Sequence, residues 1–173
     1  ESFGSLITGG IETMRLGIVA LLLSVLFLMA ACADPAADKS KAVTGEATTA
    51  ASPQTAGQGQ KYSINRQNSK IDFVASKVTG SHNGSFKEFS GVIDYAGQPE
   101  KSRVSVTIDI NSVATDADGL TQHLKTPDFF DVAKFPQATF TSTEIRAGGD
   151  KGASHTVTGN FQLHGVTKAI SFP

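Results

Sequence analysis

Strict alternation of apolar and polar residues is the feature that most limits what this chain can fold into. It is clearest over residues 103–110, where every second side chain is apolar: Val104, Val106, Ile108 and Ile110. Because successive side chains of a β-strand point to opposite faces, this pattern predicts a strand with one buried face and one wet face. The same pattern recurs at residues 70–78 and 156–164. The chain is therefore expected to form half-buried β-strands.

Two further strands are expected at residues 86–95 and 138–146, and two short ones at 62–64 and 168–172. Turn-forming residues separate the strands at 80–84, 97–99 and 148–152, because Gly, Asn and Pro suit the backbone angles of tight turns. Only residues 118–125 are expected to be helical, with Pro127 ending the helix. The prediction is an all-β antiparallel barrel or sandwich with one short helical insertion.

The N-terminal part of the chain reads differently. Residues 14–31 begin with a Met-Arg pair and continue as an apolar run, which is typical of a secretory signal peptide. The run ends in Leu28-Met29-Ala30-Ala31-Cys32, which resembles the bacterial lipobox, so Cys32 is the expected lipidation site. The alternative is an uncleaved transmembrane helix over residues 16–33, which only just reaches the length of about 18–20 residues needed to cross a bilayer.

Two further segments flank this signal. Residues 1–13 carry acidic side chains that do not suit a signal peptide, so they are expected to lie upstream of the native start. Residues 32–60 contain mainly Ala, Thr, Ser, Gly, Gln and Pro, which predicts a flexible linker before a folded domain at 61–173. The expected protein is exported, periplasmic and lipid-anchored. Ala33 after the cysteine favours the outer over the inner membrane.

Several classes of function find no support. The formal net charge of -1 gives no field that would attract nucleic acid. The four histidines form no His-x-His or His-x₃-His pair, so no metal site is expected. Asp128 and Asp131 flank two phenylalanines, and a turn role explains them better than acid–base catalysis. No nucleophile elbow or phosphate-binding loop is present, so we expect no enzyme.

Two longer motifs carry a family resemblance. Residues 123–140 read HLKTPDFFDVAKFPQATF and residues 159–168 read GNFQLHGVTK, and together with 71–76 and 84–91 they resemble the YceI-like family. That resemblance implies a lipocalin-like antiparallel β-barrel that binds a polyisoprenoid or other long-chain lipid in an apolar tunnel. Family domains continue beyond the second motif, so the barrel is expected to be incomplete here, with its C-terminal strands missing.

The expected function is that of a lipid-anchored binding protein for a polyisoprenoid, isoprenoid quinone or similar lipid, without a cofactor apart from that lipid. The alternatives are a structural or interaction domain displayed on a tether, and an enzyme acting on the bound lipid. Its partners would be the lipid and the membrane, and the oligomeric state stays open, a homodimer included. The residues expected to contact the ligand are Phe73, Val104, Val106, Ile108, Phe129, Phe130, Phe140, Phe161, Leu163, His123 and His164. The two histidines either lie at the cavity mouth or pin loops through hydrogen bonds.

Overall fold

The computed structural model describes residues 42–47, 59–77 and 80–173. The predicted signal peptide and the lipidation site at Cys32 lie outside these residues. In the part of the chain that is described, no helix has both the length and the hydropathy that crossing a bilayer requires.

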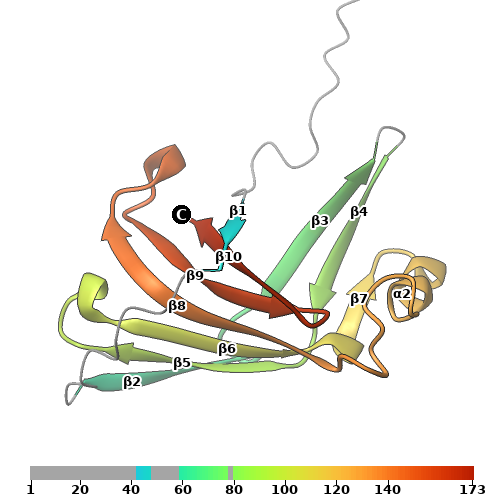
Figure 1. Cartoon of the computed structure of the whole chain (residues 1–173), viewed down its shortest axis with the longest axis horizontal. Coiled ribbons are helices and arrows are strands. Elements are labelled where there is room, and N and C mark those ends of the chain that lie inside the picture. The colour runs from blue at the N-terminus through green and yellow to red at the C-terminus, as the bar shows by residue number, and fades with distance from the viewer. Residues whose placement is uncertain (1–41, 48–58, 78–79) are drawn as a thin grey trace, which may run out of the picture. The chain divides into compact units, whose positions relative to one another are not determined.

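Every strand pair is antiparallel, in a seven-stranded and a three-stranded sheet (Figure 1). In spatial order the larger sheet contains β1 (Val43–Glu46), β10 (Val166–Phe172), β9 (His155–Leu163), β8 (Gln137–Ala147), β6 (Arg103–Asp109), β5 (Phe89–Tyr95) and β2 (Gln60–Asn65). The smaller sheet contains β3 (Ile71–Lys77), β4 (Gly80–Phe86) and β7 (Val113–Thr115). The described sheets do not close into a barrel, because β1 and β2 remain as separate edges of the larger one.

Helical structure is limited to short pieces between the strands. The single described α-helix is α2 (Asp118–Leu124), and the 3₁₀ turns are η1 (Pro99–Lys101), η2 (Ile110–Ser112) and η3 (Asp150–Gly152). The all-β antiparallel prediction with one helical insertion is therefore confirmed for the described residues. Thr121 Oγ1 accepts a hydrogen bond from the Thr115 backbone N–H at 2.9 Å, which fixes α2 to β7.

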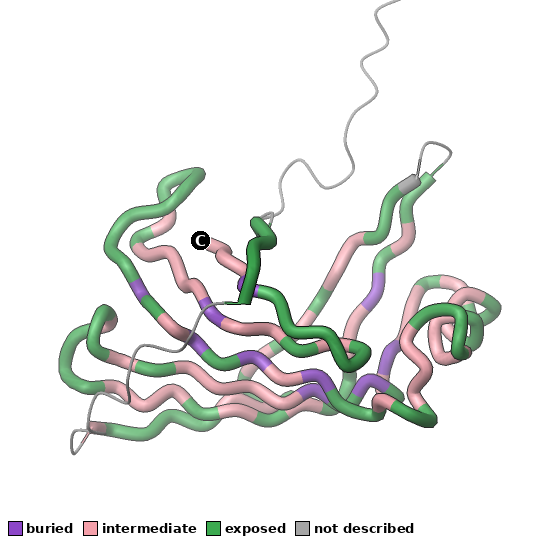
Figure 2. Tube along the Cα trace, viewed as in Figure 1, coloured by how far each residue is buried: buried purple, intermediate pink, exposed green. Residues whose placement is uncertain are grey.

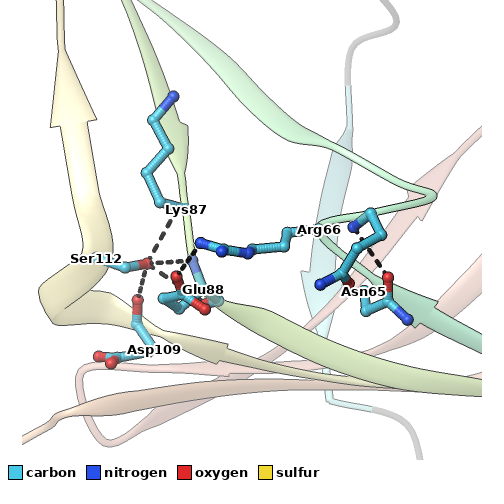
Figure 3. Close-up of polar contacts among 7 residues, drawn as sticks. Asn65, Arg66, Lys87, Glu88, Asp109 and Ser112 are labelled. Carbon is cyan, nitrogen blue, oxygen red and sulfur yellow. Dashed lines mark hydrogen bonds and ion pairs between the residues drawn. The ribbon is translucent and has the colours of Figure 1, made fainter.

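Three connections lead from one sheet to the other, and polar contacts link them to one another (Figure 3). We call this region the corner. The connections are β2 to β3, β4 to β5, and β6 to β7. The Ser112 hydroxyl accepts from the backbone N–H groups of Lys87 at 3.1 Å and Glu88 at 2.9 Å. Arg66, in the β2–β3 connection, forms an ion pair with Glu88, with 2.9 Å between Nη1 and Oε1. The bend thus keeps its backbone groups paired while the strands turn from one sheet into the other.

The core lies beside this corner, on one face of the larger sheet. Ile108, Ile110 and Ala138 are buried and touch one another, and Ile110 is only 1% exposed. Figure 2 shows buried segments along β6, β8 and the corner. Partly buried side chains from both sheets and the loop before β8 pack against this cluster: Ile71, Phe86, Phe89, Val106, Phe130, Val132, Phe161 and Leu163.

The structure corrects two local predictions. Residues 80–84, expected as a turn, belong to strand β4, because each of them pairs with a residue of β3. Propensity was misleading here, since cross-strand pairing supplies what Gly, Ser and Asn lack in intrinsic strand preference. The strand expected at 86–95 is interrupted at Lys87 and Glu88, which form the corner. Strand β7 was not predicted.

The expected flexible linker at residues 32–60 also differs from the structure at one place. Val43–Glu46 forms strand β1 and pairs with β10 from Ser171 back to Lys168. The outer edge of β10 offers backbone N–H and C=O groups that a short extended segment can satisfy, even one of polar composition.

Candidate functional site

The seven-stranded sheet has one apolar face and one polar face. Directly opposite residues of antiparallel strands share a face, and Val106, Phe140 and Phe161 are paired in this way across β6, β8 and β9. By the same register the face includes further large apolar side chains: Ile64, Phe89, Ile93, Val104, Ile108, Leu163, Ile170 and Phe172. We call this set the apolar face. The opposite face carries mainly hydroxyl and amide side chains: Ser90, Ser105, Thr107, Thr139, Thr141, Thr158, Asn160, Gln162 and Thr167.

Phenylalanine rings form two groups over the apolar side of the molecule. Phe140 and Phe172 have ring centroids 5.5 Å apart, which ties β8 to β10. Phe86 lies 5.6 Å from Phe73 and 6.2 Å from Phe130, which brings the smaller sheet and the loop before β8 together. Such offset and tilted ring pairs add to the stabilisation from burial alone.

Most of the apolar face is only half-buried. Ile108 and Phe140 are each 6% exposed, and the rest of the set keeps intermediate exposure. Tyr62 and Val166, which share this face by register, are 46% and 56% exposed. Half-buried apolar side chains on one continuous face are a surface on which a hydrocarbon chain gains free energy by losing water. The physical capacity of this face is therefore to bind apolar molecules.

The structure brings together six of the residues predicted to contact a ligand, around the core cluster: Val106, Ile108, Phe130, Phe140, Phe161 and Leu163. Phe73 joins them through its contact with Phe86. Val104 lies on the same face further along β6, where its backbone N–H donates to the buried Ser142 hydroxyl at 2.8 Å.

The remaining three predicted residues lie outside the strands: His123 in α2, and Phe129 and His164 in loops. Phe129 is 48% exposed, and its ring packs against His123 with centroids 4.8 Å apart. His164 occupies the turn between β9 and β10 at φ 51°, with its ring 4.6 Å from Phe135. Neither histidine lies in the strands that carry the row Val106, Phe140 and Phe161.

Sequence reasoning missed a charged pair on the apolar side. Lys168 is directly opposite Phe161 in the β9–β10 register, and its Nζ donates to Glu46 Oε1 at 2.6 Å. The pKa of Glu46 is lowered, first by this hydrogen bond and then by the positive charge of Lys168. The alternation of Lys168 with Ile170 and Phe172 was a readable signal for the lysine. No local signal identified Glu46, which is distant in sequence.

A second polar contact joins the smaller sheet to the start of α2. His82 Nδ1 lies 2.7 Å from Asp116 Oδ1, and the Asn83 backbone N–H donates to Asp116 Oδ2 at 2.8 Å. The bond from Asn83 is the larger cause that lowers the pKa of Asp116, followed by the bond with His82. Both partners belong to β4, so Asp116 holds that strand beside the β7–α2 turn.

Among the described residues, one other histidine lies beside an acid: His155 Nε2 is 3.4 Å from Glu100 Oε1. No three His, Cys, Asp or Glu side chains there come together as a metal site. Asp131 adopts φ 46°, and its backbone carbonyl accepts from the N–H groups of Lys134 and Phe135. Asp tolerates this left-handed conformation better than most residues, which fits the predicted turn role.

These features define a class: an all-β antiparallel protein whose sheet presents an apolar face bounded by a bent, three-stranded extension. A model of the YceI-like domain matches residues 62–173, and the chain belongs to the YceI-like family. The family resemblance of the two sequence motifs is thereby confirmed.

Related proteins extend this assignment. Protein YceI of Salmonella arizonae and that of Salmonella paratyphi B are each 44% identical to the chain over 89 residues, 51% of the chain. The same match spans 45% of each relative, so the chain spans about half the length of these curated relatives. The crystal structure of Burkholderia cenocepacia BcnA is 28% identical, with a TM-score of 0.52 over 59% of the chain and 64% of BcnA. That similarity supports the lipocalin-like antiparallel fold.

Proposed function

We propose that this protein is a non-catalytic binding protein for a long-chain apolar lipid, such as a polyisoprenoid or an isoprenoid quinone, held on its apolar face. We further propose that it is exported to the periplasm and held at the membrane by a lipidated Cys32. Family membership supports the first proposal through the ligand class that the resemblance implies. The lipobox-like sequence supports the second.

The row Val106, Phe140 and Phe161 is the observation that carries the proposal. These side chains cross three adjacent strands on one face, and Val106 and Phe161 remain half-buried. Three strands at about 4.8 Å spacing give a row about 10 Å across, long enough to contact several methylene groups at once. Each methylene removed from water contributes about 0.8 kcal/mol without any directional partner.

Replacing Phe161 with aspartate tests this role. Phe161→Asp puts a carboxylate at the β9 end of the row, where a hydrocarbon chain would have to desolvate it, so lipid retention should fall below detection. Native mass spectrometry of the purified full chain measures the adducts directly. The matched control is Gln162→Asp, which places the same charge one residue away on the polar face.

The two variants separate the candidate functions. A binding protein retains discrete lipid adducts in the wild type and in Gln162→Asp, and loses them in Phe161→Asp. Unchanged adducts in Phe161→Asp would contradict the proposed binding face. A wild-type chain free of every apolar adduct would favour the structural or interaction domain instead.

A further inference from the structure

The apolar face contains one unexpected charge. Among the lysines, arginines and carboxylates of β2, β5, β6, β8, β9 and β10, all fully described strands, only Lys168 shares a face with the large apolar side chains. The others alternate onto the polar face, as Lys61 and Asp94 do. Lys168 is 48% exposed and therefore solvated here, but a ligand that covers the face would leave its ammonium group in need of an anionic partner. Its position therefore calls for an explanation.

The partner in this structure comes from the weakly attached strand β1. Glu46 pairs directly with Lys168 in the β1–β10 register, and the Lys168 Nζ to Glu46 Oε1 distance of 2.6 Å is that of a charge-assisted hydrogen bond. Glu46 is 90% exposed and Lys168 48% exposed, so the pair itself contributes little stability. All four residues of β1 are exposed. A strand this short and this exposed can leave the edge of β10 at little cost.

Lys168 lies at one end of the proposed binding row. Lys168, Phe161, Phe140 and Val106 follow one another in register across β10, β9, β8 and β6. At about 4.8 Å per strand, this row runs about 14 Å from the ammonium end to the apolar end. A molecule lying along the row with its hydrocarbon chain over Phe161 and Phe140 would place its head at Lys168.

We propose that Lys168 is the head-group subsite of the apolar face, that it takes the oxyanion end of a long-chain ligand, and that Glu46 occupies this subsite when no ligand is bound. This inference rests on the proposed function and adds the chemistry of the head. The Glu46 carboxylate marks where a ligand carboxylate or phosphate oxygen lies. Because two anions compete for one ammonium group, ligand entry displaces Glu46, and β1 acts as an internal competitor.

The test compares anionic and neutral ligands of equal chain length on the full chain. In one competition palmitate is mixed with hexadecanol, and in the other geranylgeranyl phosphate is mixed with geranylgeraniol. Native mass spectrometry then gives the ratio of anionic to neutral adducts. Comparing this ratio between variants cancels differences in detergent partitioning. Lys168→Met keeps the unbranched shape of the side chain and removes its charge. We expect it to lower the ratio roughly three- to tenfold.

Two further variants complete the experiment. Glu46→Gln removes the internal competitor and should raise the ratio by roughly two- to fivefold. Lys61→Met is the matched control, because Lys61 forms the same kind of cross-strand pair with Asp94, at 2.9 Å, on the polar face. It should leave the ratio unchanged. A response confined to one ligand pair identifies the head as carboxylate or phosphate.

The outcomes are distinguishable from failure of the proposed function. If both adducts form but their ratio is the same in Lys168→Met as in the wild type, the head-group subsite is refuted while lipid binding stands. A ratio that does not rise in Glu46→Gln refutes the displacement of Glu46. Absence of every adduct refutes the proposed function, and this inference falls with it.

Discussion

Glycines on the apolar side make room for phenylalanine rings. A Cβ atom added to Gly159 would collide with the Phe140 ring, and one added to Gly84 would collide with the Phe73 ring. Both glycines lie in strands, where glycine is otherwise unfavourable because it costs backbone entropy and packs no side chain. Their role is therefore steric: each lets a large ring lie flat on a neighbouring strand.

Adding one methyl group at Gly159 should destabilise the fold. Gly159→Ala forces the Phe140 ring out of a 6% exposed position, and such overpacking costs about 1–3 kcal/mol. Urea unfolding followed by circular dichroism measures the loss. Gly119→Ala is the control, because nothing lies within 4 Å of a Cβ there and alanine favours the helix by about 0.5–1 kcal/mol. A Gly159→Ala variant as stable as the control would contradict the steric role.

At the scale of elements, polar contacts set the angle between the two sheets. Ser112, Glu88 and Arg66 join the three bending connections, and Asp116 fastens β4 through His82 and Asn83. These contacts are exposed, so water and protons reach them. Protonation of Asp116 should therefore weaken the attachment of the three-stranded sheet in acid.

The Asp116 contact predicts a defined pH dependence. Its pKa lies below the ordinary value of 3.8, so between the two values the unfolded chain binds more protons than the folded chain. The contribution of Asp116 to stability is therefore complete above about pH 4–5 and is lost as pH falls through the lowered pKa. Asp116→Asn should lower the urea midpoint at neutral pH, and its difference from the wild type should shrink on acidification. Parallel pH profiles for the two proteins would rule this out.

At the scale of the whole folded unit, the apolar face is incompletely covered by the described residues. The larger sheet ends in β1 at one edge and β2 at the other, and rows of apolar side chains between them keep intermediate exposure. A ligand that covers these side chains buries surface that the protein leaves in water. Binding and folding are consequently linked, because such a ligand binds the folded chain and has no comparable site in the unfolded one.

This linkage predicts stabilisation by ligand. At a free concentration 100 times its dissociation constant, a bound lipid should raise the free energy of unfolding by about 2.7 kcal/mol. Thermal unfolding of the full chain with and without palmitate measures the shift. Phe161→Asp provides the control and should show no shift. An equal shift in that variant would place the ligand away from the apolar face.

The parts of the candidate site that could be predicted are those set by residues close together in the sequence. Alternation along a single strand correctly grouped Val104, Val106 and Ile108 on one face, because side-chain direction in a strand is a local property. It could also have placed Lys168 with Ile170 and Phe172. The positions of Phe129, His123 and His164 could not be read this way, since Phe129 and His164 lie in loops and His123 lies in the short helix α2.

The sequence by itself determined the strand faces, the single helix and the family, because period-two patterning and the two long motifs are written in contiguous residues. Only the tertiary structure decided that residues 80–84 form a strand, that three connections bend at one corner, and that Glu46 meets Lys168. The strand at 80–84 depends on pairing with the preceding strand β3, and the other two depend on contacts between segments far apart in the chain. Backbone groups along a strand edge accept any extended partner, so the choice of neighbour comes from the folded arrangement and not from local composition.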